Sequence, residues 1–309
     1  MNILILGAAG FIGTNLAIEL LKNKDNQLTL VDKSRDFFVE EIKKTNAVIF
    51  DASLDSDMDF SILQGKDVVF HLVSSVIPTN SNQHITQDIK TNVVFSSALF
   101  ESCVRYKVKE VIFISSGGTV YGKDVICPIS EEMPTNPITS YGIQKLTIEK
   151  LLFLYNYMYG LDYRIIRLSN PYGPYQRPNG LLGAVTTFTY NALKGLPISV
   201  YGDGSVIRDF IYIDDVIRGI MNIFLHDSKY KVYNLGSGYG TSISHLIETI
   251  GSALSCKLNL VYKDARTVDV PVNYLNINRY EQEFGKLNPL CLSKGIKRTA
   301  DFFIRKKVC

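Results

Sequence analysis

The fold is decided by the stretch Asn2-Ile3-Leu4-Ile5-Leu6-Gly7-Ala8-Ala9-Gly10-Phe11-Ile12-Gly13. Its short apolar run, residues 3–6, ends at a glycine and predicts a strand that is buried on both faces. A helical pattern of apolar side chains follows the last glycine, at Leu16, Ile18, Leu20 and Leu21. A buried strand that turns through glycines into a helix is typical of a parallel sheet covered by helices.

The same alternation continues through the first half of the chain. Further apolar runs predict strands at residues 28–31, 47–50, 68–72, 111–115 and 163–168. Helical stretches lie between these runs, notably at residues 88–106 and 140–159. Strands that alternate with helices favour the α/β class, with a doubly wound parallel sheet. After Pro174 the alternation weakens, and the pattern of residues 200–205 predicts a hairpin with a glycine turn.

The three glycines at positions 7, 10 and 13 predict a phosphate-binding turn. Their spacing is Gly-x-x-Gly-x-x-Gly, with Ala9 where the common dinucleotide fingerprint has glycine. Phosphate would meet the backbone N–H groups and the positive end of the helix that starts here. A tight strand-to-helix turn without a ligand is the alternative.

Asp32 makes the dinucleotide interpretation stronger. It ends the second predicted strand roughly twenty residues after the glycines, where a carboxylate can bind the ribose hydroxyls of adenosine. A carboxylate there would repel a 2′-phosphate, which favours NAD over NADP. Lys33 and Arg35 follow closely and weaken this preference.

A second candidate site is the segment Thr139-Ser140-Tyr141-Gly142-Ile143-Gln144-Lys145. On a helix, Tyr141 and Lys145 are four residues apart and lie on one face. Free tyrosine has a pKa near ~10, and a lysine charge held beside it favours the phenolate. Such a pair can act as a general base for a hydroxyl group. A surface tyrosine stacked on a lysine stem is the alternative.

Together these features resemble the extended short-chain dehydrogenase/reductase family. Within it, the chain is most similar to the nucleotide-sugar epimerase and dehydratase branch, and to UDP-hexose 4-epimerases in particular. The resemblance covers nearly the whole chain, and its further matching segments are Asp51-Ala52, 71–74, Asn92, 115–122, 167–174, 208–216 and 233–238.

The resemblance implies a Rossmann-like NAD-binding domain and a smaller C-terminal substrate-binding lobe. The first comprises residues 1–170 plus about 211–235, and the second comprises about 171–210 plus 236–309. The cofactor-binding residues that it implies are Gly7, Gly10, Phe11, Ile12, Gly13, Asp32, Lys33, Asp51, Ala52, Leu72, Val73, Asn92, Ser115, Tyr141 and Lys145. The implied substrate-binding residues are Ser116, Thr119, Asn170, Leu181, Leu182, Tyr201, Arg208, Arg266 and Asn273.

The sequence departs from the family pattern at Gly117. The epimerases usually have a serine or threonine there, whose hydroxyl shares a proton with the substrate and the tyrosine. Ser116 or Thr119 could supply this O–H group in the present chain, and the sequence does not decide between them. Both are therefore candidate catalytic residues beside Tyr141 and Lys145. A serine that only caps the strand end is the alternative.

The activity implied is that of an NAD-dependent 4-epimerase acting on a UDP-hexose or UDP-N-acetylhexosamine through a transient 4-keto sugar. The modest Asn273 predicts room beside the sugar C2 substituent. A 4,6-dehydratase is disfavoured, because that branch has an Asp-Glu pair where this chain has Gly118 and Thr119. Reductase or decarboxylase chemistry on a nucleotide sugar stays open, and so does a non-catalytic NAD(P)-sensing protein.

Composition limits the remaining possibilities. The chain has 309 residues, 46% of them hydrophobic, and its net charge of +3 is too small to indicate binding to nucleic acid or membranes. Five cysteines without a Cys-x-x-Cys pair, and four histidines without a His-x-x-x-His set, predict no metal site and no disulfide framework. The first residues lack a basic leader, so we expect a cytoplasmic protein without a signal peptide. The family resemblance also implies a homodimer, for which the helices at 88–106 and 140–159 are the candidate contacts.

Overall fold

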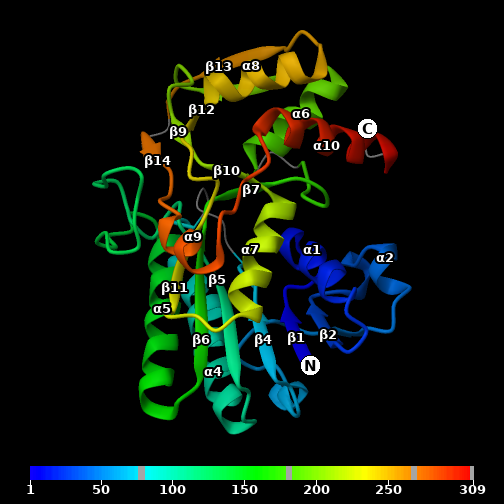
Figure 1. Cartoon of the computed structure of the whole chain (residues 1–309), viewed down its shortest axis with the longest axis vertical. Coiled ribbons are helices and arrows are strands. Elements are labelled where there is room, and N and C mark those ends of the chain that lie inside the picture. The colour runs from blue at the N-terminus through cyan, green and yellow to red at the C-terminus, as the bar shows by residue number, and fades with distance from the viewer. Residues whose placement is uncertain (76–80, 179–182, 266–269, 307–309) are drawn as a thin grey trace.

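A seven-stranded parallel sheet forms the larger part of the molecule (Figure 1). The structure is a computed structural model that describes residues 1–75, 81–178, 183–265 and 270–306. In spatial order, the sheet comprises β11 (Val232–Leu235), β6 (Asp162–Leu168), β5 (Glu110–Ser116), β4 (Val68–His71), β1 (Asn2–Leu6), β2 (Gln27–Asp32) and β3 (Val48–Asp51). Every neighbouring pair is parallel, which confirms the predicted doubly wound sheet.

Helices cover both faces of this sheet because the side chains of its buried strands alternate between two cores. Ile3 and Ile5 belong to the core beneath α1 (Phe11–Leu20) and α7 (Ile213–Leu225), while Leu4 and Leu6 belong to the core beneath α4 (Phe95–Arg105) and α5 (Ser140–Tyr159). Shorter helical segments connect the main elements: η1 (Arg35–Phe37), α2 (Glu40–Lys43), η2 (Phe60–Leu63), α3 (Ile85–Ile89) and the π-helical η3 (Lys90–Val94).

The order of the strands reverses between β1 and β4. From β1 the chain winds outward through β2 and β3, and then returns to β4 before it winds the other way through β5 and β6. In open α/β sheets, ligands bind outside the carboxyl ends of the strands at such a switch point. The glycine turn after β1 therefore lies where a cofactor is expected.

A smaller lobe lies beyond the carboxyl ends of the strands, at the top of Figure 1. Its helices α6 (Ala184–Lys194), α8 (Ile243–Leu254) and α10 (Leu292–Arg305) contact one another. Its strands are β8 (Ile198–Tyr201) with β13 (Leu260–Lys263), and β9 (Ile207–Arg208) with β12 (Thr241–Ser242) and β14 (Val272–Asn273). The parallel pair of β7 (Asn170–Tyr172) and β10 (Phe210–Tyr212) connects lobe and sheet, and α9 (Asn278–Phe284) packs near β11.

One expectation about this second half is wrong. Residues 200–205 do not form a hairpin, because β8 pairs in parallel with β13 and the glycines at 202 and 204 turn the chain away towards β9. Within residues 211–235, α7 and β11 belong to the main sheet and its helical cover, while β10 pairs with β7.

Within the described residues, no helix is long and apolar enough to cross a membrane. Nor does this part of the chain gather three or more histidine, cysteine, aspartate or glutamate side chains in an arrangement that could hold a metal ion.

Candidate active site

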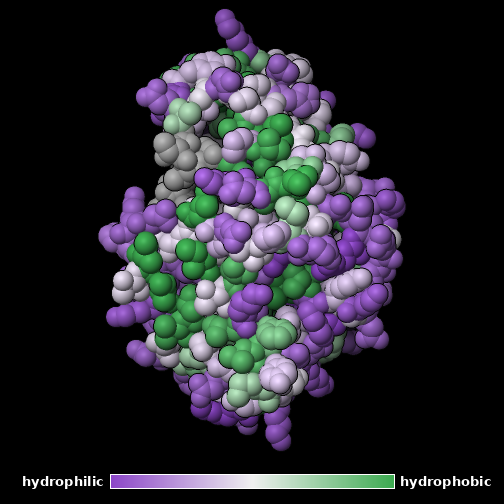
Figure 2. All heavy atoms as spheres, turned by 90° about the vertical axis from the view of Figure 1, so that its left-hand side faces the viewer, coloured by the Kyte–Doolittle hydropathy of each residue, from purple (hydrophilic) through white to green (hydrophobic). Residues whose placement is uncertain are grey.

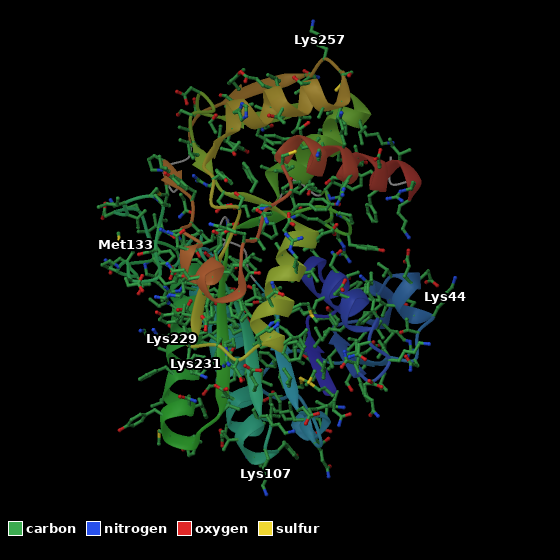
Figure 3. All side chains as sticks on the ribbon, viewed as in Figure 1. Lys44, Lys107, Met133, Lys229, Lys231 and Lys257 are labelled. Carbon is green, nitrogen blue, oxygen red and sulfur yellow. The ribbon has the colours of Figure 1, made fainter. Side chains whose placement is uncertain are left out.

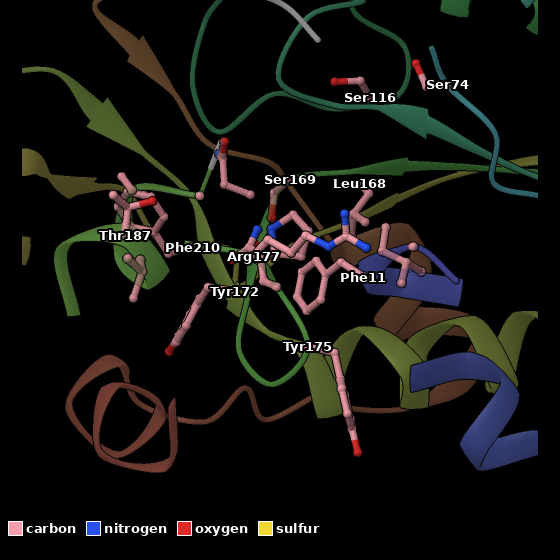
Figure 4. A pocket seen from close by; sticks show the side chains of 18 of the residues that line it. Phe11, Ser74, Ser116, Leu168, Ser169, Tyr172, Tyr175, Arg177, Thr187 and Phe210 are labelled. Atoms are coloured by element: carbon pink, nitrogen blue, oxygen red, sulfur yellow. The ribbon is translucent and has the colours of Figure 1, made fainter. Parts of the chain in front are cut away.

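A cavity of about 930 Å³ lies between the carboxyl ends of the strands and the smaller lobe (Figure 4). This volume is at the upper end of the range for small-molecule sites, which run from about 300 to 1,000 Å³. The residues predicted from the sequence that line it are Gly7, Gly10, Phe11, Ile12, Gly13, Asp32, Leu72, Ser115, Ser116, Tyr141, Asn170, Tyr201 and Arg208. Both groups of predicted residues, for cofactor and for substrate, thus meet in one cavity.

The start of α1 forms one end of the cavity. Gly10 caps the helix without a side chain of its own, so the amides of the first turn are not covered by a capping group. A Cβ atom at Gly13 would lie 2.3 Å from the carbonyl oxygen of Gly7, which explains why this position is glycine. A turn this tight, with its helix end facing a cavity, fits the pyrophosphate of a dinucleotide.

Asp32 lies beside this turn and lines the same end of the cavity. Its Oδ2 accepts a hydrogen bond from the Ala9 amide at 2.9 Å, and its Oδ1 accepts one from the Lys33 amide at 2.8 Å. These bonds fix the carboxylate while leaving further acceptor capacity for ribose hydroxyls. The Lys33 side chain is exposed and does not line the cavity. Asp51 is also exposed, and Ala52 donates its amide to the Asp32 carbonyl oxygen.

Lys145 is buried on α5, four residues after Tyr141, which rules out the surface alternative for the Tyr-x-x-x-Lys pair. The residue is only 6% exposed, whereas Lys44, Lys107 and Lys257 project from the molecule (Figure 3). Its Nζ donates a hydrogen bond to the carbonyl oxygen of Ile114 at 2.8 Å. The same atom lies 5.7 Å from the centre of the Tyr141 ring. The start of α5 thus presents a phenol and an ammonium group together.

The Ser116 side chain, at the end of β5, lies close enough to the Tyr141 hydroxyl to oppose the rise of its pKa. Burial raises this pKa to about 12. Burial lowers the pKa of Lys145 to about 8, and the charge of Glu149 opposes that fall. The pKa of Tyr141 is raised, whereas the sequence predicted that it would be lowered. The reason is that desolvation of the phenolate outweighs its stabilisation by neighbouring groups. A further positive charge is needed to make Tyr141 a base at neutral pH.

The structure brings Ser116, and not Thr119, to the tyrosine. Ser116 lines the cavity, whereas the Thr119 Oγ1 is buried and has no hydrogen-bond partner among the described residues. The position that usually carries the hydroxyl is closed: a Cβ at Gly117 would lie 2.6 Å from a methyl group of Leu275, which is itself fully buried. A serine at 117 would therefore require Leu275 to move.

Three other predicted residues support the cavity without lining it. Asn92 is buried, and its amide group bonds to Ser75 and, at 2.8 Å, to the Gln144 side chain on α5. Val73 packs in the core behind Leu72. Asn273 is 1% exposed, and its Nδ2 lies 3.5 Å from the Gly117 carbonyl oxygen.

On the substrate side, Asn170 and Arg208 are held by backbone carbonyl groups. The Asn170 Nδ2 donates to the Asp209 carbonyl oxygen at 2.9 Å, and the Arg208 Nη1 donates to the Val270 carbonyl oxygen at 2.6 Å. Tyr201 lies at the end of β8 and lines the cavity. The predictions at Leu181, Leu182 and Arg266 fall outside the described residues.

The cavity also has a wall that the sequence did not reveal. Tyr175 and Arg177 follow β7, and the Arg177 guanidinium lies 5.5 Å from the centre of the Phe37 ring (Figure 4). Helix α6 contributes Phe188 and Asn191. The sequence offered one hint of this wall, because Arg177 comes just after the matching segment 167–174. The residues of α6 carry no motif that could have predicted their role.

A doubly wound sheet with a glycine turn at its switch point, and a buried Tyr-x-x-x-Lys pair on the same cavity, defines an enzyme of the extended short-chain dehydrogenase/reductase class. The chain belongs to the NAD dependent epimerase/dehydratase family, whose model matches residues 3–236. NAD is its cofactor, and the glycine turn and Asp32 fit that group.

Individual relatives are similar to this chain over nearly its whole length. The UDP-glucose 4-epimerase of Mycolicibacterium smegmatis is 32% identical over 99% of both chains. The crystal structure of UDP-glucose 4-epimerase from Thermotoga maritima with UDP-glucose has a TM-score of 0.91 at 32% identity, over 100% of both chains. UDP-N-acetylglucosamine 4-epimerase from Methanobrevibacter ruminantium, in complex with UDP-N-acetylmuramic acid, has a TM-score of 0.89 at 29% identity, over 99% of this chain and 98% of that one.

Proposed function

We propose that the protein is a nucleotide-sugar 4-epimerase that inverts C4 of a UDP-hexose or UDP-N-acetylhexosamine through a transient 4-keto sugar. The observation that carries this proposal is that Tyr141 and Ser116 line the same cavity as the glycine turn. The similarity to UDP-glucose and UDP-N-acetylglucosamine 4-epimerases supports the same substrate class.

In this mechanism Tyr141 removes the proton of the sugar 4-hydroxyl and later returns it. A bound NAD would supply the acceptor and donor of the C4 hydride, and its positively charged ring would favour the phenolate form of the tyrosine. Ser116 donates a hydrogen bond to the phenolate, and the Lys145 ammonium group adds positive charge beside it. The C4 epimer would form when the hydride returned to the opposite face of the 4-keto sugar.

The substrate end of the cavity is suited to an anion. Arg208 lines it, and a planar guanidinium with several N–H donors matches the oxygens of a diphosphate. Asn170 and Tyr201 lie on the same wall. We propose that these three residues hold the nucleotide diphosphate.

The proposal predicts interconversion of C4 epimers without a net change in redox state. Purified protein incubated with UDP-glucose, UDP-galactose and their N-acetylamino counterparts should convert at least one pair in both directions, measured by chromatography that resolves the epimers. Conversion of UDP-N-acetylglucosamine but not UDP-glucose would show that the site accepts and requires an N-acetyl group at C2. Stoichiometric consumption of reduced cofactor, or no product from any of these sugars, would contradict epimerisation and favour a reductase.

We further propose that the active form is a homodimer in which α4 and α5 pack against the same helices of a second copy. Exposed apolar side chains gather on α5, including Phe153 at 58%, Leu154 at 45% and Met158 at 56% exposure. Figure 2 views the molecule from the side that lies to the left in Figure 1, where α5 is found. Apolar side chains are spread over the lower half of that side. Val94, just before α4, extends the patch. Burial of such side chains against a second copy would remove them from water.

The dimer can be tested by placing charge on the helix face. Wild-type protein should have a mass of twice 34.7 kDa in light scattering at micromolar concentration. Phe153→Lys combined with Met158→Glu should give monomers, because charges buried in an apolar interface are costly. Tyr262→Lys, a change at an exposed aromatic residue on the smaller lobe, is the matched control and should leave the dimer intact. A monomeric wild-type protein would rule out this assembly.

A further inference from the structure

A third ionisable side chain continues the line of Tyr141 and Lys145 along α5. Glu149 follows Lys145 by four residues, so the phenol, the ammonium group and the carboxylate lie on one face of the helix. The carboxylate is as deeply buried as the ammonium group, at 4% and 6% exposure. A buried charge is costly unless it is paired and hydrogen-bonded.

Glu149 is fixed by two neighbouring strands of the main sheet, β5 and β6. Its Oε1 accepts a hydrogen bond from the Ser115 hydroxyl of β5 at 2.5 Å. Its two oxygens also bind the Arg167 guanidinium of β6, with the shortest contact at 2.7 Å. Ser115 directly precedes Ser116, whose side chain lies close to the Tyr141 hydroxyl. The carboxylate thus contacts the segment that carries the catalytic hydroxyl.

Arg167 connects Glu149 and Ser115 to further polar side chains. Its Nη1 donates to the Tyr121 hydroxyl at 3.0 Å, and that hydroxyl donates to the Asn234 side chain at 2.7 Å. Glu149 therefore belongs to a network of satisfied polar groups that connects α5, β5, β6 and β11. Such networks hold their members in one arrangement.

We propose that Glu149 is a positioning residue: its carboxylate fixes the Ser115–Ser116 end of β5 beside Tyr141, and its negative charge keeps Lys145 in the ammonium form. The proposal rests on the role given to Lys145 in the proposed function. It assigns to the helix a functional triplet, Tyr-x-x-x-Lys-x-x-x-Glu, in which the third residue touches neither sugar nor cofactor.

Among the groups around Lys145, Glu149 is the one that can keep it in the ammonium form. On α5, its ionisable neighbours are Tyr141, protonated at neutral pH, and Glu149 itself. On β4, His71 stays neutral because burial and the Lys145 charge lower its pKa to about 3. On β5, Lys145 meets the Ile114 carbonyl oxygen and the Phe113 ring. Arg167 on β6 approaches Glu149. Within the described residues, Glu149 is thus the negative charge that acts on Lys145.

Glu149→Gln tests the charge while it keeps an oxygen that can accept the Ser115 hydrogen bond. We expect the Lys145 pKa to fall by about one unit, since loss of a nearby opposite charge disfavours the protonated form. The pKa can be followed by NMR of protein labelled with ¹³C-lysine, with the Lys145 signal identified by its loss in Lys145→Met. This measurement needs no turnover, so a failure of the proposed epimerase reaction would not affect it.

Two further variants separate charge from loosened packing. Glu149→Gln leaves Arg167 buried without its partner, which destabilises the fold, so the double variant Glu149→Gln/Arg167→Met removes both charges. It should also have a lower Lys145 pKa than the wild type. Arg167→Met alone keeps the carboxylate and should not lower it. If water merely entered a loosened core, the Lys145 pKa would instead rise towards its ordinary value in every variant. A rise, or no change, in both proteins that carry Glu149→Gln would overturn the proposal.

Discussion

Tyr141→Phe is expected to reduce kcat by about 10²–10⁴-fold, the usual contribution of a positioned general base. The substitution removes only the phenolic oxygen, which lies close to Ser116 in a buried position. The neighbouring Ser116 and Lys145 do not replace it as the base, because a neutral hydroxyl is a weak base and the Lys145 Nζ donates to the Ile114 carbonyl oxygen. The ring remains, so the shape of the cavity should be kept.

The expected loss is confined to turnover. NAD content of the purified protein and the affinity for the nucleotide sugar, measured by calorimetry, should stay near the wild-type values. Tyr157→Phe is the matched control, since Tyr157 lies on the same helix but is 81% exposed. Its kcat should be unchanged. Near-normal turnover of Tyr141→Phe would disprove the assignment of the base.

The strand pattern and the glycine spacing were sufficient to predict the sheet and the glycine turn that lines the cavity. Both depend on short-range physics: a buried strand must be apolar on both faces, and Gly13 must lack a Cβ because the Gly7 carbonyl oxygen is 2.3 Å from that point. Tyr141 and Lys145 could be paired for a similar reason, because helical spacing alone puts them on one face.

Other features depend on contacts between distant segments, which the sequence does not display. The parallel pairing of β8 with β13 replaced the predicted hairpin, although the glycines were correctly seen as a turn. The glycine at 117 reflects a contact with Leu275, which is distant in the sequence and would clash with a Cβ at that position. The pKa of Tyr141 depended on burial, which exceeds the effect of its helical neighbour.

Ser116→Ala is expected to lower kcat by about 10²-fold, in line with the loss of one positioned donor to a developing oxyanion. The Ser116 side chain lowers the pKa of Tyr141 against the effect of burial. Without it the phenolate forms less readily at any given pH. The acid limb of the kcat profile should therefore move to higher pH, which a merely structural role would not cause.

Thr119→Val is the contrasting variant and decides which hydroxyl serves the reaction. Valine has nearly the shape of threonine, and the hydroxyl that it replaces is buried with no hydrogen-bond partner in the described part of the chain. Removal of an unpaired buried hydroxyl is neutral or stabilising, by up to about 1–3 kcal/mol. We therefore expect unchanged kcat and an equal or higher Tm, measured by calorimetry. If Thr119→Val instead lost turnover while Ser116→Ala kept it, Thr119 would be the residue that replaces the hydroxyl missing at Gly117.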